Sequence, residues 1–447
     1  RKRLGLQGPR QARASGVHDS IPDLIRGLRP AYPTMGARDM VVLLRQEHHI
    51  KISEPNLLKI FQEVEPEKVR GRKGARFKRS RFYSAGVFEI LSFDQHDKWK
   101  RFGLWLHLAI DPYTGYLHWQ KIWWTNRNTA LVTGYYLEAV RKIAKMGPNF
   151  KPAIPLLTFS DTGRENNGIA KCHSTLRQRL DPTLVGSIQH KWHYDKMNIK
   201  SEISWSRMRR GFATGFENLL EDGQLQGIVD FEKLDPIETF LFRWLFIPYL
   251  QAKLDKWTER QNTSKRRSYK RKILPHGVPR EIHEYPERFG GVNYSVFPVS
   301  VELLDEMQAI WSPPDNLVFD LTSSSFNVCA SKFYAELGSP VIEYGSIWEI
   351  FVQMRFAFDN NVTEEDRNVI VVEYHSQLEV FGQDVDLVEM SDKDVPVDQA
   401  FVDDRLFSDT EEIDDELEGS DGEYEIELTD EEEQEEEEID SFLRNQE

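Results

Sequence analysis

The sequence predicts an α/β protein built around a mixed five-stranded sheet with flanking helices. Three strand patterns follow one another between residues 87 and 125, and the turn residues of DPYTG separate the last two. From residue 129 to residue 220, strands alternate with helical patterns, an order that brings strands into parallel pairs. Three short helical segments between residues 20 and 65 precede this core.

Composition excludes several classes of protein. At 447 residues the chain is long enough for two or three domains of about 150 residues each. It has only two cysteines, Cys172 and Cys329, which excludes a disulfide framework and a cysteine-ligated zinc site. The densest apolar stretch, residues 240–250, is too short to cross a bilayer and contains Arg243. We therefore expect a soluble protein with no membrane partner.

Charge is distributed very unevenly along the chain. Residues 384–447 contain 29 acidic and three basic residues, a net charge of −26. The other 383 residues contain 54 basic and 44 acidic residues and so carry a net charge of +10, which suits a polyanionic partner. The acidic tail, residues 379–447, has too little apolar content to pack and is predicted to be disordered. Three roles stay open for it: contacting histones, covering the chain's own basic surface, or keeping the protein soluble.

The N-terminal part is basic and helical. Residues 1–18 are rich in glycine and are predicted to form a disordered basic arm. In residues 19–66, apolar side chains such as Met40, Leu43 and Leu44 recur at helical spacing in three segments with tight joints. This pattern favours a helix-turn-helix-like DNA-binding module, and a small bundle that only packs on the core is the alternative.

Two basic runs are candidate DNA contacts. The basic linker, residues 67–82, has eight Lys or Arg and one Glu, with phenylalanines interleaved, which favours phosphate contacts over a solvated linker. A second run opens residues 251–378, a basic C-terminal region whose fold the sequence does not predict. The predicted DNA-binding side chains are Arg70, Arg72, Lys73, Arg76, Lys78, Arg79, Arg209, Lys265, Arg266 and Arg267.

The predicted core, residues 83–250, contains five strands and three helices. Their order, three strands followed by strands that alternate with helices, is that of an RNase H-like mixed sheet. The strands are predicted at 87–95, 101–111, 116–125, 154–161 and 186–194, and the helices at 129–145, 166–180 and 201–220.

Three carboxylates in this core are candidates for metal-dependent phosphoryl transfer. Asp94 lies inside an apolar strand, where a charge is costly unless a metal or another group pairs with it. Asp161 ends an apolar strand at the edge where open sheets place ligands, and Glu202 opens the last long helix. Oxygen ligands suit hard cations, so we expect Asp94, Asp161 and Glu202 to hold two Mg²⁺ or Mn²⁺ ions.

Each assignment has a simpler alternative. The first carboxylate could be Asp97 instead of Asp94, because both lie in SFDQHDKW. Asp161 could only cap the following helix, and Glu202 could be an ordinary first-turn glutamate favoured by the helix dipole. His190 and His193, on either side of Trp192, are expected to be ordinary strand histidines, with a proton relay or phosphate contact as the alternative, and Asp111 is expected to be a turn residue.

The three segments that carry these carboxylates resemble the catalytic core of DDE integrases and transposases. The first-carboxylate hairpin of such cores is similar to SFDQHDKWKRFGLWLHLAIDPYTGYLHWQKIWW. Their Asp-x-Gly-x-Glu segment is similar to FSDTGRENNGIA, and the stretch that opens their catalytic-glutamate helix is similar to HYDKMNIKSEISWSRMRR. Residues 19–378 as a whole resemble the integrase-core proteins of mushroom-forming fungi, a family derived from mobile elements.

This resemblance implies a function. The family's catalytic carboxylates fall on Asp94, Asp161 and Glu202, and the implied activity is a metal-dependent DNA strand transfer or cleavage. Double-stranded DNA would be the partner, a homo-oligomer the working form and the nucleus the location. The interval between Asp161 and Glu202 is longer than in retroviral integrases, and their zinc-binding module is absent. The competing functions are a domesticated, catalytically silent nuclear DNA-binding protein and a nuclease acting on RNA.

Overall fold

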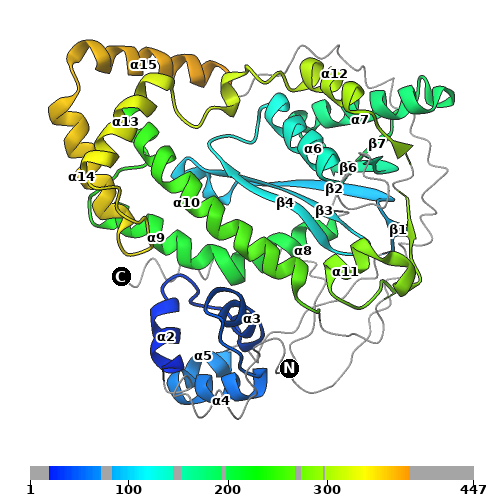
Figure 1. The fold of residues 1–447 in the computed structure, drawn as a ribbon, viewed down its shortest axis with the longest axis horizontal. Helices are drawn as coiled ribbons and strands as arrows, with labels where there is room; N and C mark the ends of the chain where they lie inside the picture. The colour runs from blue at the N-terminus through cyan, green and yellow to red at the C-terminus, as the bar shows by residue number, and fades with distance from the viewer. Residues whose placement is uncertain are drawn as a thin grey trace, which may run out of the picture.

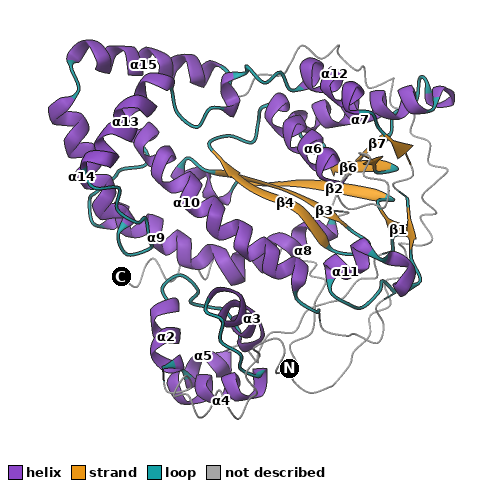
Figure 2. Ribbon diagram, viewed as in Figure 1, coloured by secondary structure: helices purple, strands orange, loops and turns teal. Residues whose placement is uncertain are grey.

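A five-stranded mixed sheet forms the centre of the molecule. The computed structural model describes residues 20–71, 83–143, 153–193, 198–266, 273–294 and 297–381. The strand order is β4-β3-β2-β6-β7, as Figures 1 and 2 show. The strands are β2 (Ile90–His96), β3 (Trp105–Asp111), β4 (Tyr116–Trp123), β6 (Leu157–Asp161) and β7 (His190–His193). The predicted α/β class and the mixed five-stranded sheet are confirmed.

Strand register decides which side chains meet on the sheet. β2 runs antiparallel to β3, which pairs Asp94 with Leu108, and parallel to β6, which pairs Ser92 with Phe159. Two residues further along this parallel pair, Asp94 of β2 comes level with Asp161 of β6. Both aspartates therefore lie at the same end of the sheet, where the parallel strands β2 and β6 finish.

Alternation along the strands sends apolar side chains to two separate cores. Leu91 and Phe93 face α6 (Thr129–Ile143), α7 (Asn167–Leu180) and α12 (Val301–Trp311). The opposite face of the sheet, which carries Leu106 and Leu108, packs against α8 (Ile199–Met208) and α10 (Pro236–Thr263). Asp94 pairs with Leu108 and so belongs to the α8 face. The sheet is thus a middle layer between two layers of helices (Figure 1).

Two predicted elements differ from the observed ones. The strand expected to begin at residue 101 begins at Trp105, because residues 98–102 form a 3₁₀ helix that buries Trp99 and Phe102 three residues apart. The helix expected over 201–220 is observed as α8, a π-helical turn over Arg209–Ala213, and α9 (Thr214–Leu225). The apolar residues that predicted this helix, such as Met208 and Phe216, are nevertheless buried on both sides of the π-helical turn.

The N-terminal helices share a core with the rest of the molecule. These helices are α2 (Ile21–Leu28), α3 (Ala37–Glu47), α4 (Glu54–Val64) and α5 (Pro66–Gly71). Their buried side chains join the apolar cluster of α8 to α10, and Tyr32 meets Phe216 edge to face at 6.3 Å. Gly215 of α9 leaves no room for a β-carbon beside the Ala31 carbonyl, and Glu47 forms ion pairs with Lys256 and Arg260. This packing agrees with the bundle alternative, and a DNA-binding role for the helices stays a prediction.

Helix α10 covers the open edge of the sheet at β4. Asn262 accepts a hydrogen bond from Leu117 N at 2.9 Å and donates one to Leu117 O at 2.8 Å. Gln251 does the same with Ile122 N at 2.8 Å and Gln120 O at 2.9 Å. The eleven residue steps from Gln251 to Asn262 span about 16 Å of helix, which matches the length of the five residue steps from Leu117 to Ile122 in a strand.

The region of unpredicted fold is helical. The expected domain boundary at residue 250 falls inside α10, which continues to Thr263. The later helices are α11 (Pro279–Glu284), α13 (Ser324–Glu336), α14 (Ile347–Asn361) and α15 (Glu364–Glu379), and the two-residue pairs are β1 (Gly86–Val87) with β8 (Val292–Asn293) and β5 (Ala153–Ile154) with β9 (Phe297–Pro298).

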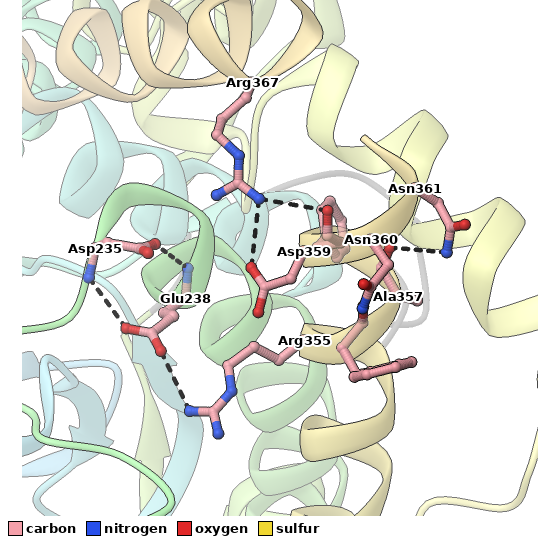
Figure 3. Close-up of polar contacts among 10 residues, drawn as sticks. Asp235, Glu238, Arg355, Ala357, Asp359, Asn360, Asn361 and Arg367 are labelled. Carbon is pink, nitrogen blue, oxygen red and sulfur yellow. Dashed lines mark hydrogen bonds and ion pairs between the residues drawn. The ribbon is translucent and has the colours of Figure 1, made fainter. Parts of the chain in front are cut away.

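Polar contacts fasten α14 and α15 to the start of α10. Asp235 and Glu238 form a capping box at that start, and Arg355 of α14 donates to Glu238 Oε1 at 3.3 Å (Figure 3). Arg367 of α15 donates to Asp359 of α14 at 3.3 Å.

The fold continues two residues beyond the predicted start of the acidic tail, because Phe381 packs on Trp105 and Trp124.

Candidate active site of three carboxylates

The structure brings Asp94 and Asp161 together at one end of the sheet, the carboxyl end of β2 and β6. The side chains of Asn198 and Asp94 lie near enough to the Asp161 carboxyl group to lower its pKa, against the larger effect of burial. Asp94 lies inside β2 and is half-buried, whereas Asp161 is the last residue of β6 and is exposed. Two strands whose aspartates are 67 residues apart along the chain therefore supply neighbouring acidic groups, as the sequence predicted.

Helix α8 lies alongside this end of the sheet and adds the third carboxylate. Glu202, in the first turn of α8, is near enough to Asp94 for its negative charge to raise the pKa of that carboxyl group. Asn198 precedes Glu202 by four residues and Trp205 follows it by three, a spacing that puts all three on one side of the helix. The side chains of Asn198 and Trp205 also reach the two aspartates.

Both oxygens of the Asp94 carboxylate accept hydrogen bonds from the protein. Gln95 N donates to Oδ1 at 2.9 Å, and the indole Nε1 of Trp205 donates to Oδ2 at 2.9 Å. The Trp205 ring stacks on His96, with the ring centroids 4.9 Å apart and the planes inclined by 16°. Asp94 is therefore held in one orientation by its own strand and by α8.

The electrostatics of the site favour a cation. Burial raises the pKa of Asp94 well above its usual value, and the charges of Asp161 and Glu202 act in the same direction. Burial also raises the pKa of Asp161 and of Glu165, which follows in the same loop. Burial, together with the charges of Lys98 and Arg209, lowers the pKa of His96 to about 4. Carboxylates that crowd together are stabilised when positive charge enters between them.

The residues present suit a hard divalent cation by their chemistry. Two neighbouring aspartates and a glutamate that influences the first of them offer only oxygen donors, which Mg²⁺ and Mn²⁺ prefer. Within the described residues, no group of three or more His, Cys, Asp or Glu is already arranged to hold a metal ion. Glu202 is the member that would have to complete such a group.

Asp97, Asp111 and His190 have identifiable structural contacts. Asp97 is exposed just after β2, where it accepts a hydrogen bond from Asn126 at 3.2 Å and pairs with Arg127 at 3.4 Å. Asp111 is fully buried at the end of β3 and organises the turn to β4. His190 is buried between the Thr158 and Ser160 hydroxyls, and both of its ring nitrogens are hydrogen-bonded. The side chain of His193 lies outside the described residues.

The predicted DNA-binding side chains do not all lie at the end of the sheet that carries the three carboxylates. Arg209 begins the π-helical turn and lies near His96, beside the carboxylates. Arg266 instead donates to Gly115 O at 2.7 Å in the turn between β3 and β4, so this arginine and the neighbouring exposed Lys265 lie at the opposite end of the sheet. The side chain of Arg70, and all of Arg72, Lys73, Arg76, Lys78, Arg79 and Arg267, lie outside the described residues.

Comparison with known proteins gave no assignment. No protein-family model matches the chain, and no curated protein matches it. In the part of the chain that the structure describes, no helix has the length and apolar character needed to span a membrane.

Proposed function

We propose that this protein is a metal-dependent DNA strand transferase or endonuclease of the DDE integrase and transposase type. Asp94, Asp161 and Glu202 are its catalytic carboxylates in this proposal, and two Mg²⁺ or Mn²⁺ ions are its cofactors. The fold in which these residues lie, an RNase H-like sheet, belongs to the same proposal. It is supported by the strand order and by the mixture of parallel and antiparallel pairs.

One observation carries the proposal. Asp94 and Asp161 lie level on neighbouring parallel strands, near enough for each to shift the pKa of the other, and the charge of Glu202 on α8 also raises the pKa of Asp94. Crowding like charges at a partly buried place costs stability, and proteins accept that cost mainly where the charges have a function. Protein donors hold both oxygens of Asp94, and the charges of Asp161 and Glu202 raise its pKa.

The proposed reaction is an in-line displacement at phosphorus. A water molecule or a DNA 3′-hydroxyl forms the new bond to phosphorus while the bond to the bridging oxygen breaks, and the leaving oxygen takes up a proton. Two divalent cations, when bound, supply the charge that stabilises the attacking and leaving oxygens. The three carboxylates hold these charges in place, and Arg209 is suited to contact the DNA backbone beside them.

The proposal includes the setting in which this reaction takes place. Double-stranded DNA is the proposed partner, because residues 1–383 have a net charge of +10. Joining two DNA ends calls for more than one active site, so a homo-oligomer is the proposed working form. Chromosomal DNA as the target makes the nucleus the proposed location.

Nicking of supercoiled plasmid by the purified full chain tests the proposal. We expect cutting with Mn²⁺ or Mg²⁺ and a loss of at least about 1,000-fold in Asp94→Asn, Asp161→Asn and Glu202→Gln. Asp97→Asn is the matched control, because this exposed aspartate lies three residues from Asp94 and pairs with Arg127 instead. It should cut nearly as well as the unchanged chain.

The outcomes separate the alternatives. Loss of cutting in Asp97→Asn with retention in Asp94→Asn would exchange the two assignments. Cutting that persists only in Glu202→Gln would remove Glu202 from the site. If the unchanged chain binds DNA tightly and never cuts it, the catalytic proposal is wrong and the silent DNA-binding protein replaces it. Preference for RNA over DNA would favour the nuclease.

A further inference from the structure

We propose that Asn198 and Trp205 are positioning residues that set the two catalytic aspartates from the helix that carries Glu202. This role rests on the function proposed above and deepens it. Neither residue was predicted from the sequence. The consequence is that the arrangement of all three carboxylates depends on the placement of one helix, α8.

Asn198 joins α8 to both carboxylate strands. It precedes the first residue of α8, a place where an asparagine commonly caps the helix, yet its side chain makes no capping hydrogen bond. Instead its Oδ1 accepts from Ser92 Oγ at 2.7 Å and its Nδ2 donates to Phe93 O at 3.0 Å, both in β2. The same side chain lies near enough to the Asp161 carboxyl group on β6 to lower its pKa. A buried amide is thus used entirely between the strands that carry the aspartates.

Trp205 holds Asp94 from the other end of the same helical face. Its indole Nε1 donates to Asp94 Oδ2 at 2.9 Å, while Gln95 N fixes Oδ1 at the same distance. The ring is buried and stacks on His96, so the indole has little freedom to turn away. With one donor on each oxygen, the carboxylate is oriented but keeps lone pairs for a ligand.

Each contact lies one turn from Glu202, and this makes the set mechanically coupled. Asn198 is four residues before Glu202 and Trp205 three residues after it, and α-helices are stiff over such distances. If α8 shifts, Glu202 and the groups that hold Asp161 and Asp94 move together. Groups that orient metal ligands from behind are needed for affinity as well as for geometry, and losing one commonly lowers metal affinity by roughly 10- to 100-fold.

Mn²⁺ binding by the full chain, followed by electron paramagnetic resonance of the free ion, tests this role without any turnover. Trp205→Phe keeps the ring that stacks on His96 and removes the N–H donor, and we expect Mn²⁺ affinity to fall by about tenfold. Trp205→His restores an aromatic donor and should recover affinity to within about threefold of the unchanged chain. Asn198→Ala should weaken Mn²⁺ binding by about tenfold.

Two matched controls separate positioning from general damage to the fold. Trp99 is buried and donates its indole N–H to Glu217 at 2.6 Å, so Trp99→Phe breaks the same kind of bond elsewhere. Asn126 is buried and donates to Leu106 O at 3.1 Å and to Asp97, so Asn126→Ala is the counterpart of Asn198→Ala. Both controls should bind Mn²⁺ within about twofold of the unchanged chain.

The possible results are distinct. If Asp94→Asn binds Mn²⁺ as tightly as the unchanged chain, the proposed metal function fails. If Asp94→Asn loses Mn²⁺ while Trp205→Phe and Asn198→Ala keep it, the function stands and the positioning role is overturned. Equal losses in Trp99→Phe and Trp205→Phe, or no recovery in Trp205→His, would also overturn it, because the effect would then come from packing alone.

Discussion

The two ends of the central sheet each carry an enclosed aspartate, and their surroundings differ. Asp111, at the end of β3, accepts hydrogen bonds from Phe88 N at 2.8 Å, from Thr114 N at 2.9 Å and from the Thr114 hydroxyl at 3.0 Å. Asp94, near the end of β2, accepts two hydrogen bonds and faces Asp161 and Glu202. One carboxylate is surrounded by donors, and the other is surrounded partly by carboxylates.

This difference distinguishes a carboxylate that stabilises the fold from the carboxylate that we propose for a reaction. Burial raises the pKa of Asp111 to about 6, but the donors around it act against that rise. For Asp94 the neighbouring charges add to the effect of burial. Removing the Asp111 carboxylate should therefore lower the free energy of unfolding. Removing the charge of Asp94 should raise it, because the repulsion from the neighbouring carboxylates is reduced.

Replacing Asp111 is expected to have the largest effect on stability. Asp111→Ala leaves Phe88 N, Thr114 N and the Thr114 hydroxyl without their buried acceptor. We expect the free energy of unfolding to fall by about 3 kcal/mol, measured by urea denaturation of the full chain. A loss below about 0.5 kcal/mol would mean that water replaces the carboxylate, and the comparison between the two ends would fail.

Acid is expected to destabilise the fold through His107, a buried histidine that stays uncharged in the folded protein. His107 of β3 is buried and accepts the Trp119 indole N–H at 3.0 Å, and burial lowers its pKa to about 3 from 6.5. The unfolded chain therefore takes up the proton first, so this contribution to stability is complete above pH 6.5 and is lost as pH falls toward 3. Between pH 6.5 and 5 the loss is about 2 kcal/mol.

The variant His107→Asn isolates this contribution. The variant should be less stable than the unchanged chain at pH 7.5. Below pH 6.5 its free energy of unfolding should fall less steeply with decreasing pH, by the contribution of about one proton, as urea midpoints at several pH values would show. His49→Gln, at an exposed histidine, is the control and should follow the unchanged chain. An unaltered slope in His107→Asn would show that His107 is charged in the fold.

The smallest expected effect is a gain in stability at the proposed site. Asp94→Asn keeps the shape of the side chain and removes one of three crowded negative charges. We expect the free energy of unfolding to rise by about 1 kcal/mol at pH 7.5 without added metal, measured in urea. A clear loss of stability would instead give Asp94 the structural role of Asp111.

Local patterns in the sequence predicted the sheet and the first two carboxylates well. Apolar strands bounded by turns placed Asp94 inside β2 and Asp161 at the end of β6, and the parallel order brought them level. The helix with Glu202 was also expected, from the spacing of its apolar residues. These features depend on neighbouring residues, which periodicity reports directly.

Features that depend on distant residues were not predicted. The bond from Trp205 to Asp94 joins residues 111 apart, and that from Asn198 to Ser92 joins residues 106 apart. Nothing local marks an asparagine before a helix as a tie between strands, because the same residue usually caps the helix. The length of α10 was missed for another reason, since its apolar and polar residues alternate on several faces that contact different neighbours.

The amide contacts along β4 limit how copies of this chain can assemble. Asn262 and Gln251 already occupy backbone groups that an incoming strand would need at this edge. Joining two sheets into one continuous sheet through β4 is therefore blocked, and so is the aggregation that exposed edges invite. The homo-oligomer proposed above would have to use other surfaces, such as the β7 edge or the outer helices. The same two amides thus restrict both misassembly and the geometry of any working assembly.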